Sequence, residues 1–121
     1  MPVSELRLPL NAEGVSGTLV VDTSVAAKLA GTEARATYGV VAMPVSTVRR
    51  LARLGKDSLA DGVTVEVVDD ALHISLHVVM ERGINLAQVT ANLQEQVRYR
   101  VEKVAGIPVT EITVRVEDLQ D

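Results

Sequence analysis

Two histidines and a serine are the residues of this chain whose spacing most invites a chemical role. His73, Ser75 and His77 occupy alternate positions. An imidazole beside a hydroxyl is the combination used in nucleophilic catalysis, and imidazoles with carboxylates can bind a metal ion. The segment 72–80 alternates apolar residues with these three, which predicts a strand that carries them on one face. On a strand the two histidines lie about 13 Å apart, too far to share one metal ion.

Neither kind of chemistry is supported by the rest of the sequence. Ser75 has no G-x-S-x-G turn around it, and no helix N-terminus is placed to form an oxyanion hole. The carboxylates expected near the histidines are Glu66 and Glu117, so solvated cross-strand pairs are the favoured interpretation. We therefore predict no catalytic residue, no metal and no cofactor, and a protein that is not an enzyme. His73 and His77, with Arg115, are kept as candidate interaction residues.

Three segments of alternating polarity predict the strands of a sheet. Residues 63–67 and 72–80 alternate in polarity and are joined at 69–71, which predicts a hairpin with one buried and one polar face. The same alternation predicts a last strand at 112–117. The polar face of this sheet is expected to carry Thr64, Glu66, His73, Ser75, His77, Thr113, Arg115 and Glu117.

Two long helices are predicted between the strands. The first, at about 24–38, is rich in alanine and glycine, and Asp22, Thr23 or Ser24 can cap it. Its small residues at 26, 30 and 34 predict either close packing within the chain or a self-association face. The second, at 85–104, has one apolar stripe and starts at Asn85, with Gln88 in the position of a capping-box partner.

The order of elements predicts the fold class. A strand at 17–21 precedes the first helix, and 40–43 could form a short extended piece. In residues 1–15, Leu6, Leu8 and Leu10 alternate with Arg7 and Pro9, so this segment is either a strand that forms a hairpin with 17–21 or a disordered arm. The remainder, 16–121, is predicted to be a single α+β domain. Its expected architecture is a two-layer βαββαβ sandwich, with one mixed or antiparallel sheet and both long helices on one face.

A basic segment separates the two halves of the chain. A short helix is predicted to start at Ser46 or Thr47 and to end at Gly55, and no acidic residue lies between Pro44 and Lys56. The segment carries Arg49, Arg50, Arg53 and Lys56, and removing these four leaves 8 basic against 16 acidic residues, a formal charge of −8. The segment could bind nucleic acid, an anionic membrane surface or an acidic partner. We favour the simpler interpretation, in which its arginines pair with acidic residues of the same domain.

Composition excludes several classes of function. The chain has 121 residues, 22 of them Val, with two Tyr and no Phe, Trp or Cys, and a formal charge of −4. The absence of cysteine excludes disulfides and thiolate chemistry, and the strands lack the aromatic residues that stack nucleic-acid bases. No apolar run approaches the about 18 residues that a membrane span needs. We therefore expect a cytoplasmic protein without an integral membrane segment, for which nucleic-acid binding is unlikely.

Eight short segments form a further pattern: 17–22 (GTLVVD), 25–31, 39–43 (GVVAM), 62–67 (GVTVEV), 83–86 (GINL), 92–97 (NLQEQV), 106–109 (GIPV) and 113–119 (TVRVEDL). Together they resemble the bacterial alkaline shock protein family, also called the envelope stress response family. The resemblance covers roughly residues 16–119; residues 1–15 lie outside it and 44–60 match loosely, so the basic segment takes no role from it. Members often have Asn where this chain has Thr113.

The resemblance implies a small non-enzymatic protein of cell-envelope stress homeostasis. Some members resemble cytoplasmic adaptors that self-associate and are held at the inner membrane face by a separate anchor protein. The resulting hypothesis is an oligomeric protein-interaction module or scaffold, recruited by a protein partner such as a membrane anchor. The alternatives are a module that binds nucleic acid or anionic membrane through residues 49–56, and an enzyme or ligand carrier that uses the His73 and His77 face.

Overall fold

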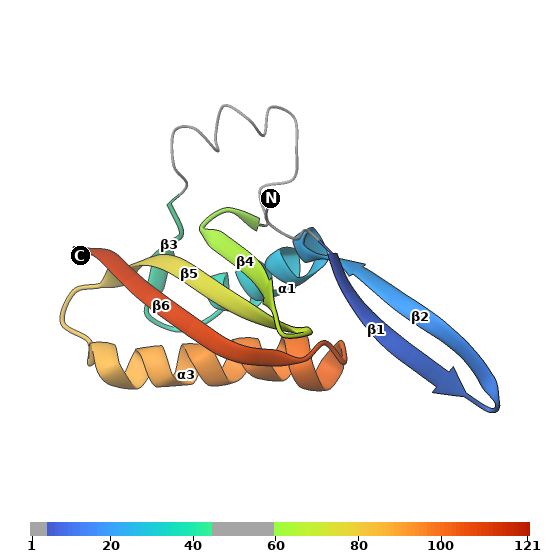
Figure 1. The fold of residues 1–121 in the computed structure, drawn as a ribbon. Coiled ribbons are helices and arrows are strands. Elements are labelled where there is room, and N and C mark those ends of the chain that lie inside the picture. Colours follow the sequence, from blue (N-terminus) through green and yellow to red (C-terminus); the bar gives the residue numbers. More distant parts are fainter. Residues whose placement is uncertain (1–4, 45–59) are drawn as a thin grey trace.

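A long central strand organises the main sheet of the protein, whose computed structural model describes residues 5–44 and 60–121 (Figure 1). Strand β5 (Ala71–Glu81) pairs antiparallel with β4 (Val63–Val68) and β3 (Val40–Ala42) along one edge. Along its other edge β5 pairs in parallel with β6 (Val109–Gln120). The main sheet is therefore mixed, and the predicted α+β class is confirmed.

Two helices cover one face of this sheet. Helix α1 (Thr23–Arg35) begins after Asp22, whose Oδ1 accepts the Ser24 N–H at 2.9 Å. Helix α3 (Leu86–Arg98) begins after Asn85, whose Oδ1 accepts the Gln88 N–H at 3.0 Å. Both caps satisfy amide groups that have no partner within a helix.

The second helix differs from its prediction in two respects. Its α-helical part ends at Arg98, and the chain continues as a π-helical segment, η2 (Tyr99–Val104). The side chain of Gln88 donates to Asn92 Oδ1 at 3.1 Å. The Asn85 cap is thus formed, but the reciprocal half of the predicted capping box is not, because the amide of Gln88 bonds to the next helical turn.

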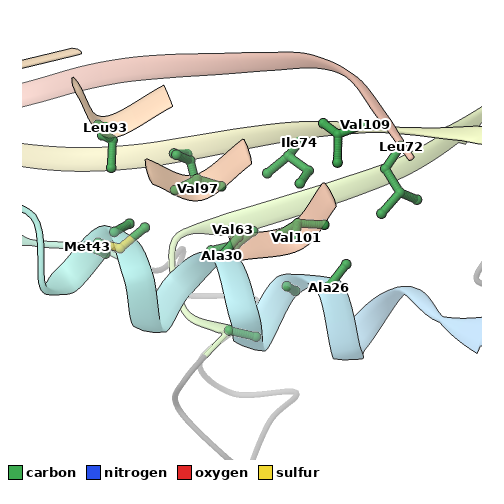
Figure 2. Close-up of a cluster of buried hydrophobic side chains, with 14 of the residues drawn as sticks. Ala26, Ala30, Met43, Val63, Leu72, Ile74, Leu93, Val97, Val101 and Val109 are labelled. Carbon is green, nitrogen blue, oxygen red and sulfur yellow. The ribbon is translucent and has the colours of Figure 1, made fainter. Parts of the chain in front are cut away.

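The core lies between the helices and the apolar face of β5. In Figure 2, Leu93, Val97 and Val101 belong to the same buried cluster as Leu72 and Ile74. The residues that α3, η2 and β5 place in this core are Val89, Leu93, Val97, Val101, Leu72, Ile74, Leu76, Val78 and Met80. These residues are spaced by four on the helix and by two on the strand, and they belong to the apolar patterns from which the elements were predicted.

The alanine ridge of α1 also belongs to the core. Ala26, Ala30 and Ala34 are each 0% exposed and lie in the same cluster. The ridge therefore packs within the chain, and the alternative prediction of a self-association face at these residues was wrong. Small side chains let the axis of α1 approach β4 and α3 closely.

The first two strands form a separate ribbon. Strands β1 (Glu5–Ala12) and β2 (Val15–Asp22) pair antiparallel over all eight register positions, and the pair projects away from the helices and the main sheet (Figure 1). The prediction that residues 17–21 join one common sheet was wrong. Strand β5 already has β3 and β4 on one edge and β6 on the other, whereas residues 5–12 reach β2 through a two-residue turn.

Candidate functional site

The face of the main sheet opposite the helices carries the polar residues predicted from alternation. Three register rows cross it: Glu66, His73 and Glu111; Thr64, Ser75 and Thr113; and His77 with Arg115. We call this surface the open face, which consists of Thr64, Glu66, His73, Ser75, His77, Glu111, Thr113, Arg115 and Glu117.

His73 pairs with a carboxylate that the sequence did not single out. Its Nδ1 lies 3.1 Å from Oε2 of Glu111 on β6, while Glu66, the expected partner, stands opposite it on β4. The predicted last strand began only at residue 112, and its parallel pairing with β5 was not foreseen. A register shift that skips Thr110 places Glu111 directly beside His73.

His77 pairs with the carboxylate that was expected. Its Nδ1 lies 2.6 Å from Oε1 of Glu117, and the side chains are 30% and 43% exposed. Arg115 is the register partner of His77 on β6 and is exposed. Arg115 and Glu117 therefore place opposite charges close together on this edge of the open face.

Ser75 lies between the histidines without the geometry of a catalytic serine. Its cross-strand neighbours are Thr64 and Thr113, and residues two apart on a strand are about 6.6 Å apart at Cα. Both histidines direct Nδ1 to glutamates. Three grooves in the described part of the chain, of about 640, 350 and 280 Å³, have none of these three residues in their linings.

The largest of these three grooves lies between α3 and the first residues of β6. It is lined by Ala91, Gln94, Glu95 and Arg98 of α3 and by residues 109–112. Gln94 donates from Nε2 to the backbone oxygen of Ile112 at 2.8 Å. This oxygen therefore points away from β5, into an edge that has no strand beside it among the described residues.

A second surface with an unusual composition is one side of the β1–β2 ribbon. Residues opposite each other in an antiparallel pair share a face, so the register places eight uncharged, apolar or small residues on one side. Val15 is 71% exposed, Leu10 50% and Leu19 37%. We call this surface the hairpin face, which consists of Leu6, Leu8, Leu10, Ala12, Val15, Gly17, Leu19 and Val21.

The hairpin face is anchored at one end and free at the other. Leu6 is 1% exposed and belongs to the core cluster, against which Leu8 and Val21 also pack. The exposed residues Leu10 and Val15 lie toward the turn at Glu13 and Gly14, where φ is 50° and 81°. Sequence analysis predicted the alternation of residues 6–10 but not that this apolar side would be left uncovered.

The basic segment cannot be placed in this geometry. Arg49, Arg50, Arg53 and Lys56 lie outside the described residues. Of the predicted interaction residues, His73, His77 and Arg115 are brought together on the open face. No helix of the described ranges is long and apolar enough to cross a membrane.

Comparison with known families identifies the class of protein. The chain belongs to the alkaline shock protein 23 family, which is described by a cell envelope-related function and whose model matches residues 11–120. The expected family is thus confirmed, and the match begins at residue 11, so it also covers the end of β1 and the whole ribbon turn, which the resemblance had left outside. It names no catalytic residue and no partner.

Individual relatives are similarly small and carry no assigned activity. The chain is 26% identical over 107 residues to the uncharacterized protein Spy1614 of Streptococcus pyogenes, covering 86% of this chain and 88% of that protein. It is 25% identical over 107 residues to the uncharacterized protein YloU of Bacillus subtilis, covering 86% and 89%. A shorter likeness, 28% over 68 residues, joins 56% of the chain to half of YqhY of the same bacterium. No solved structure matches the chain.

Proposed function

We propose that this protein is a non-catalytic interaction module of cell-envelope stress homeostasis, which self-associates and is recruited by a protein partner. The observation that carries the proposal is the hairpin face. A two-stranded ribbon is at best marginally stable alone in water, and exposed contiguous apolar surface marks interaction sites. A ribbon with an uncharged face of eight residues is suited to binding another surface.

The polar chemistry of the open face supports a binding role more than a catalytic one. His73 and His77 each pair with a glutamate, and neither histidine lines the three grooves, although Glu111, the partner of His73, lines the groove of about 640 Å³. A catalytic site normally combines a concave pocket with converging polar groups. On a flat surface the same side chains can select a partner by charge complementarity.

Recruitment to the envelope is proposed from the family description together with the helices. The family has a cell envelope-related function, and none of the described helices is a membrane span. A protein partner that holds the module at the inner membrane face would account for both. The hairpin face and the open face lie on different elements, so self-association and recruitment can use separate surfaces.

The first test is a pull-down of the tagged full chain from nuclease-treated native lysate, combined with sedimentation velocity of the purified chain. We expect concentration-dependent oligomers and recovery of a defined protein partner. Leu10→Asp with Val15→Asp should abolish the oligomers, because both charges would enter the apolar contact. Thr64→Asp is the matched control, since it adds a charge on the other sheet. A monodisperse monomer that recovers no partner would overturn the proposal.

The charge distribution favours one further candidate function. Arg49, Arg50, Arg53 and Lys56 concentrate a third of the 12 basic residues in eight positions. Binding of anionic vesicles or nucleic acid through this segment should weaken steeply with salt. Reversal of Arg49, Arg50 and Arg53 to Glu should remove that binding; if binding persists at full strength, the segment is not responsible.

A further inference from the structure

We infer that the hairpin of one copy adds to the outer edge of β6 in a second copy, with its hairpin face over the groove beside α3. The inference rests on the proposed self-association and specifies its geometry. It combines two unpartnered features of the described structure, the exposed hairpin face of the ribbon and an outer edge of β6 with no strand beside it.

The outer edge of β2 has an intact set of backbone groups. A two-residue turn makes Ala12 and Val15 a hydrogen-bonded pair, so bonded pairs recur every second position along the ribbon. The backbone groups of Ser16, Thr18 and Val20 consequently point outward. On β1 the equivalent outward position opposite Thr18 is Pro9, which has no N–H. Strand β2 is therefore the better edge for adding to another sheet.

The outer edge of β6 presents a matching set. Because Ile112 turns its backbone oxygen outward to Gln94, alternation places the backbone groups of Val114 and Val116 on the same side. The N–H of His77 bonds to Gly62 on the β4 side, which agrees with this alternation across β5. Outward backbone groups of this kind are templates for strand addition, and an added strand would take the place of the Gln94 side chain at the Ile112 oxygen.

Side-chain parity selects the direction of pairing. In an antiparallel ladder Thr18 would share a face with Val114, and the hairpin face would lie on the polar side of the sheet. In a parallel ladder the N–H and C=O of a residue bond to the two residues that flank its register partner. If Thr18 bonds to Val114, its register partner is therefore a flanking residue such as Thr113, and Val114 stands beside Leu19. The hairpin face then lies on the helix side, where the groove of about 640 Å³ includes Ala91 and Ile112.

Charge and area favour this arrangement over two hairpins packed face to face. Strand β2 has no charged residue between Val15 and Val21, so nothing in it repels Glu111, Arg115 or Glu117 on β6. The hairpin face measures about 27 Å by about 10 Å, a footprint of about 270 Å². A face-to-face pair would bury far less than the about 800 Å² per partner of a stable interface, whereas strand addition contributes about six main-chain hydrogen bonds as well.

The contact has a consequence for assembly. The donor ribbon and the acceptor edge are different surfaces, so each copy can donate to one neighbour and accept from another. A head-to-tail contact of this kind closes into a ring or grows into a filament, unlike a two-fold contact, which stops at a dimer.

Cross-linking tests the geometry directly because the chain contains no cysteine. Copies with Thr18→Cys are mixed with differently tagged copies with Thr113→Cys and treated with a short bifunctional maleimide. Thr113 would lie about 5 Å from the added strand. Thr64→Cys is the matched control: the row Thr64, Ser75, Thr113 crosses the sheet, so Thr64 would lie about 14 Å away. We expect cross-links with Thr113→Cys and at least tenfold fewer with Thr64→Cys.

A backbone variant provides the second readout. Thr18→Pro removes an outward N–H of β2 while leaving the hydrogen-bonded pairs of the ribbon in place, and Thr18→Ala is its control. We expect Thr18→Pro to weaken self-association at least tenfold in sedimentation velocity, with an unchanged circular dichroism spectrum, and Thr18→Ala to have little effect. Oligomers that resist Thr18→Pro, or that cross-link through Leu10→Cys to itself, would overturn this geometry and keep self-association. A monomer at every concentration would overturn both.

Discussion

Two hairpins of this molecule are built by the same local rules and meet different surroundings. The β4–β5 hairpin turns at Asp69 and Asp70 with φ of 50° and 61°, and the β1–β2 hairpin turns at Glu13 and Gly14 with φ of 50° and 81°. Each alternates an apolar and a polar side. Helices α1 and α3 cover the apolar side of β5, whereas most of the hairpin face is left to solvent.

The difference shows that alternation specifies which side of a strand is apolar but not what covers it. The helices that cover β5 are supplied by the same chain, and α3 follows β5 directly in the sequence. For β1 and β2, the described part of the chain supplies only the anchoring contacts around Leu6. Substitutions in the two regions should therefore affect different properties: the free energy of unfolding for one, and association for the other.

The largest expected effect comes from Leu93→Ala in α3. Leu93 is 0% exposed against β5, and removing a buried leucine side chain costs about 2–5 kcal/mol through lost transfer energy and the cavity left behind. Leu10→Ala, in the hairpin face, should change the free energy of unfolding by less than about 0.5 kcal/mol. Urea unfolding at low protein concentration measures both. Equal losses would show that the ribbon is as well covered as the core.

Two glycines with similar backbone angles sharpen the comparison. Gly62 and Gly14 have φ of +79° and +81°. A Cβ on Gly62 would lie 2.8 Å from Met43 Cβ and 3.0 Å from the backbone oxygen of His77, whereas a Cβ on Gly14 would meet nothing within 4 Å. Gly14→Ala should cost about 1 kcal/mol through backbone strain. Gly62→Ala should cost about 1–3 kcal/mol more through overpacking.

Thermal or urea unfolding of both alanine variants tests this. Similar losses at the two positions would mean that backbone strain alone determines the cost, and that the chain around Met43 yields to the added methyl group. The contrast isolates packing from conformation because the two glycines share one backbone region.

How much of the fold could be predicted follows from the range over which each signal acts. Periodicity and caps are local, so a strand at 72–80, Asn85 as a cap, Asp22 as one of three candidate caps, and the polar side of the sheet were predicted. The pairing of β6 with β5 joins residues about forty positions apart, and its parallel register depends on a bulge at Thr110. No local pattern encodes that register, which is why Glu111 was missed.

The candidate site was predicted in part for the same reason. His73, His77 and Arg115 come together because alternation and strand order sufficed to place them on one face. Predicting the hairpin face required knowing the conformation of residues 1–15, for which a strand and a disordered arm were both left open. The alternation of Leu6, Leu8 and Leu10 is a local pattern in the sequence. Whether a helix covers these residues depends on the tertiary structure, which no local pattern encodes.

A small effect is expected at the His77–Glu117 pair. Both side chains are partly exposed, and exposed ion pairs stabilise proteins by about 0–1 kcal/mol because water and salt screen them. A double-mutant cycle with His77→Ala and Glu117→Gln should give a coupling free energy below about 1 kcal/mol. A larger coupling would indicate that the open face is less solvated than its exposure suggests, and would favour a structural role for the pair over partner binding.

The smallest effect is expected at the junction of the two regions, where Asp22 ends β2 and caps α1. The Ser24 backbone N–H, which donates to the Asp22 carboxylate, and then the Ser24 side chain hold the pKa of Asp22 below its usual value. A lowered folded-state pKa means that the charged form adds stability above the unfolded pKa of about 3.9, and that this contribution is lost as pH falls through the folded pKa. Asp22→Asn keeps an acceptor but no charge. The stability difference between the two proteins should be constant at neutral pH and shrink below about pH 4.

Urea unfolding from pH 7 to pH 3 measures that difference, and the acid sensitivity of all other groups cancels in it. A difference that does not change with pH would mean that the cap acts only through its hydrogen bond. Because Asp22 lies at the base of the ribbon and outside the hairpin face, the Thr18→Cys to Thr113→Cys cross-link should form equally well in the Asp22→Asn background. Loss of the cross-link there would show that the ribbon and α1 are coupled through their junction, and that association depends on how the ribbon leaves the body as well as on its apolar face.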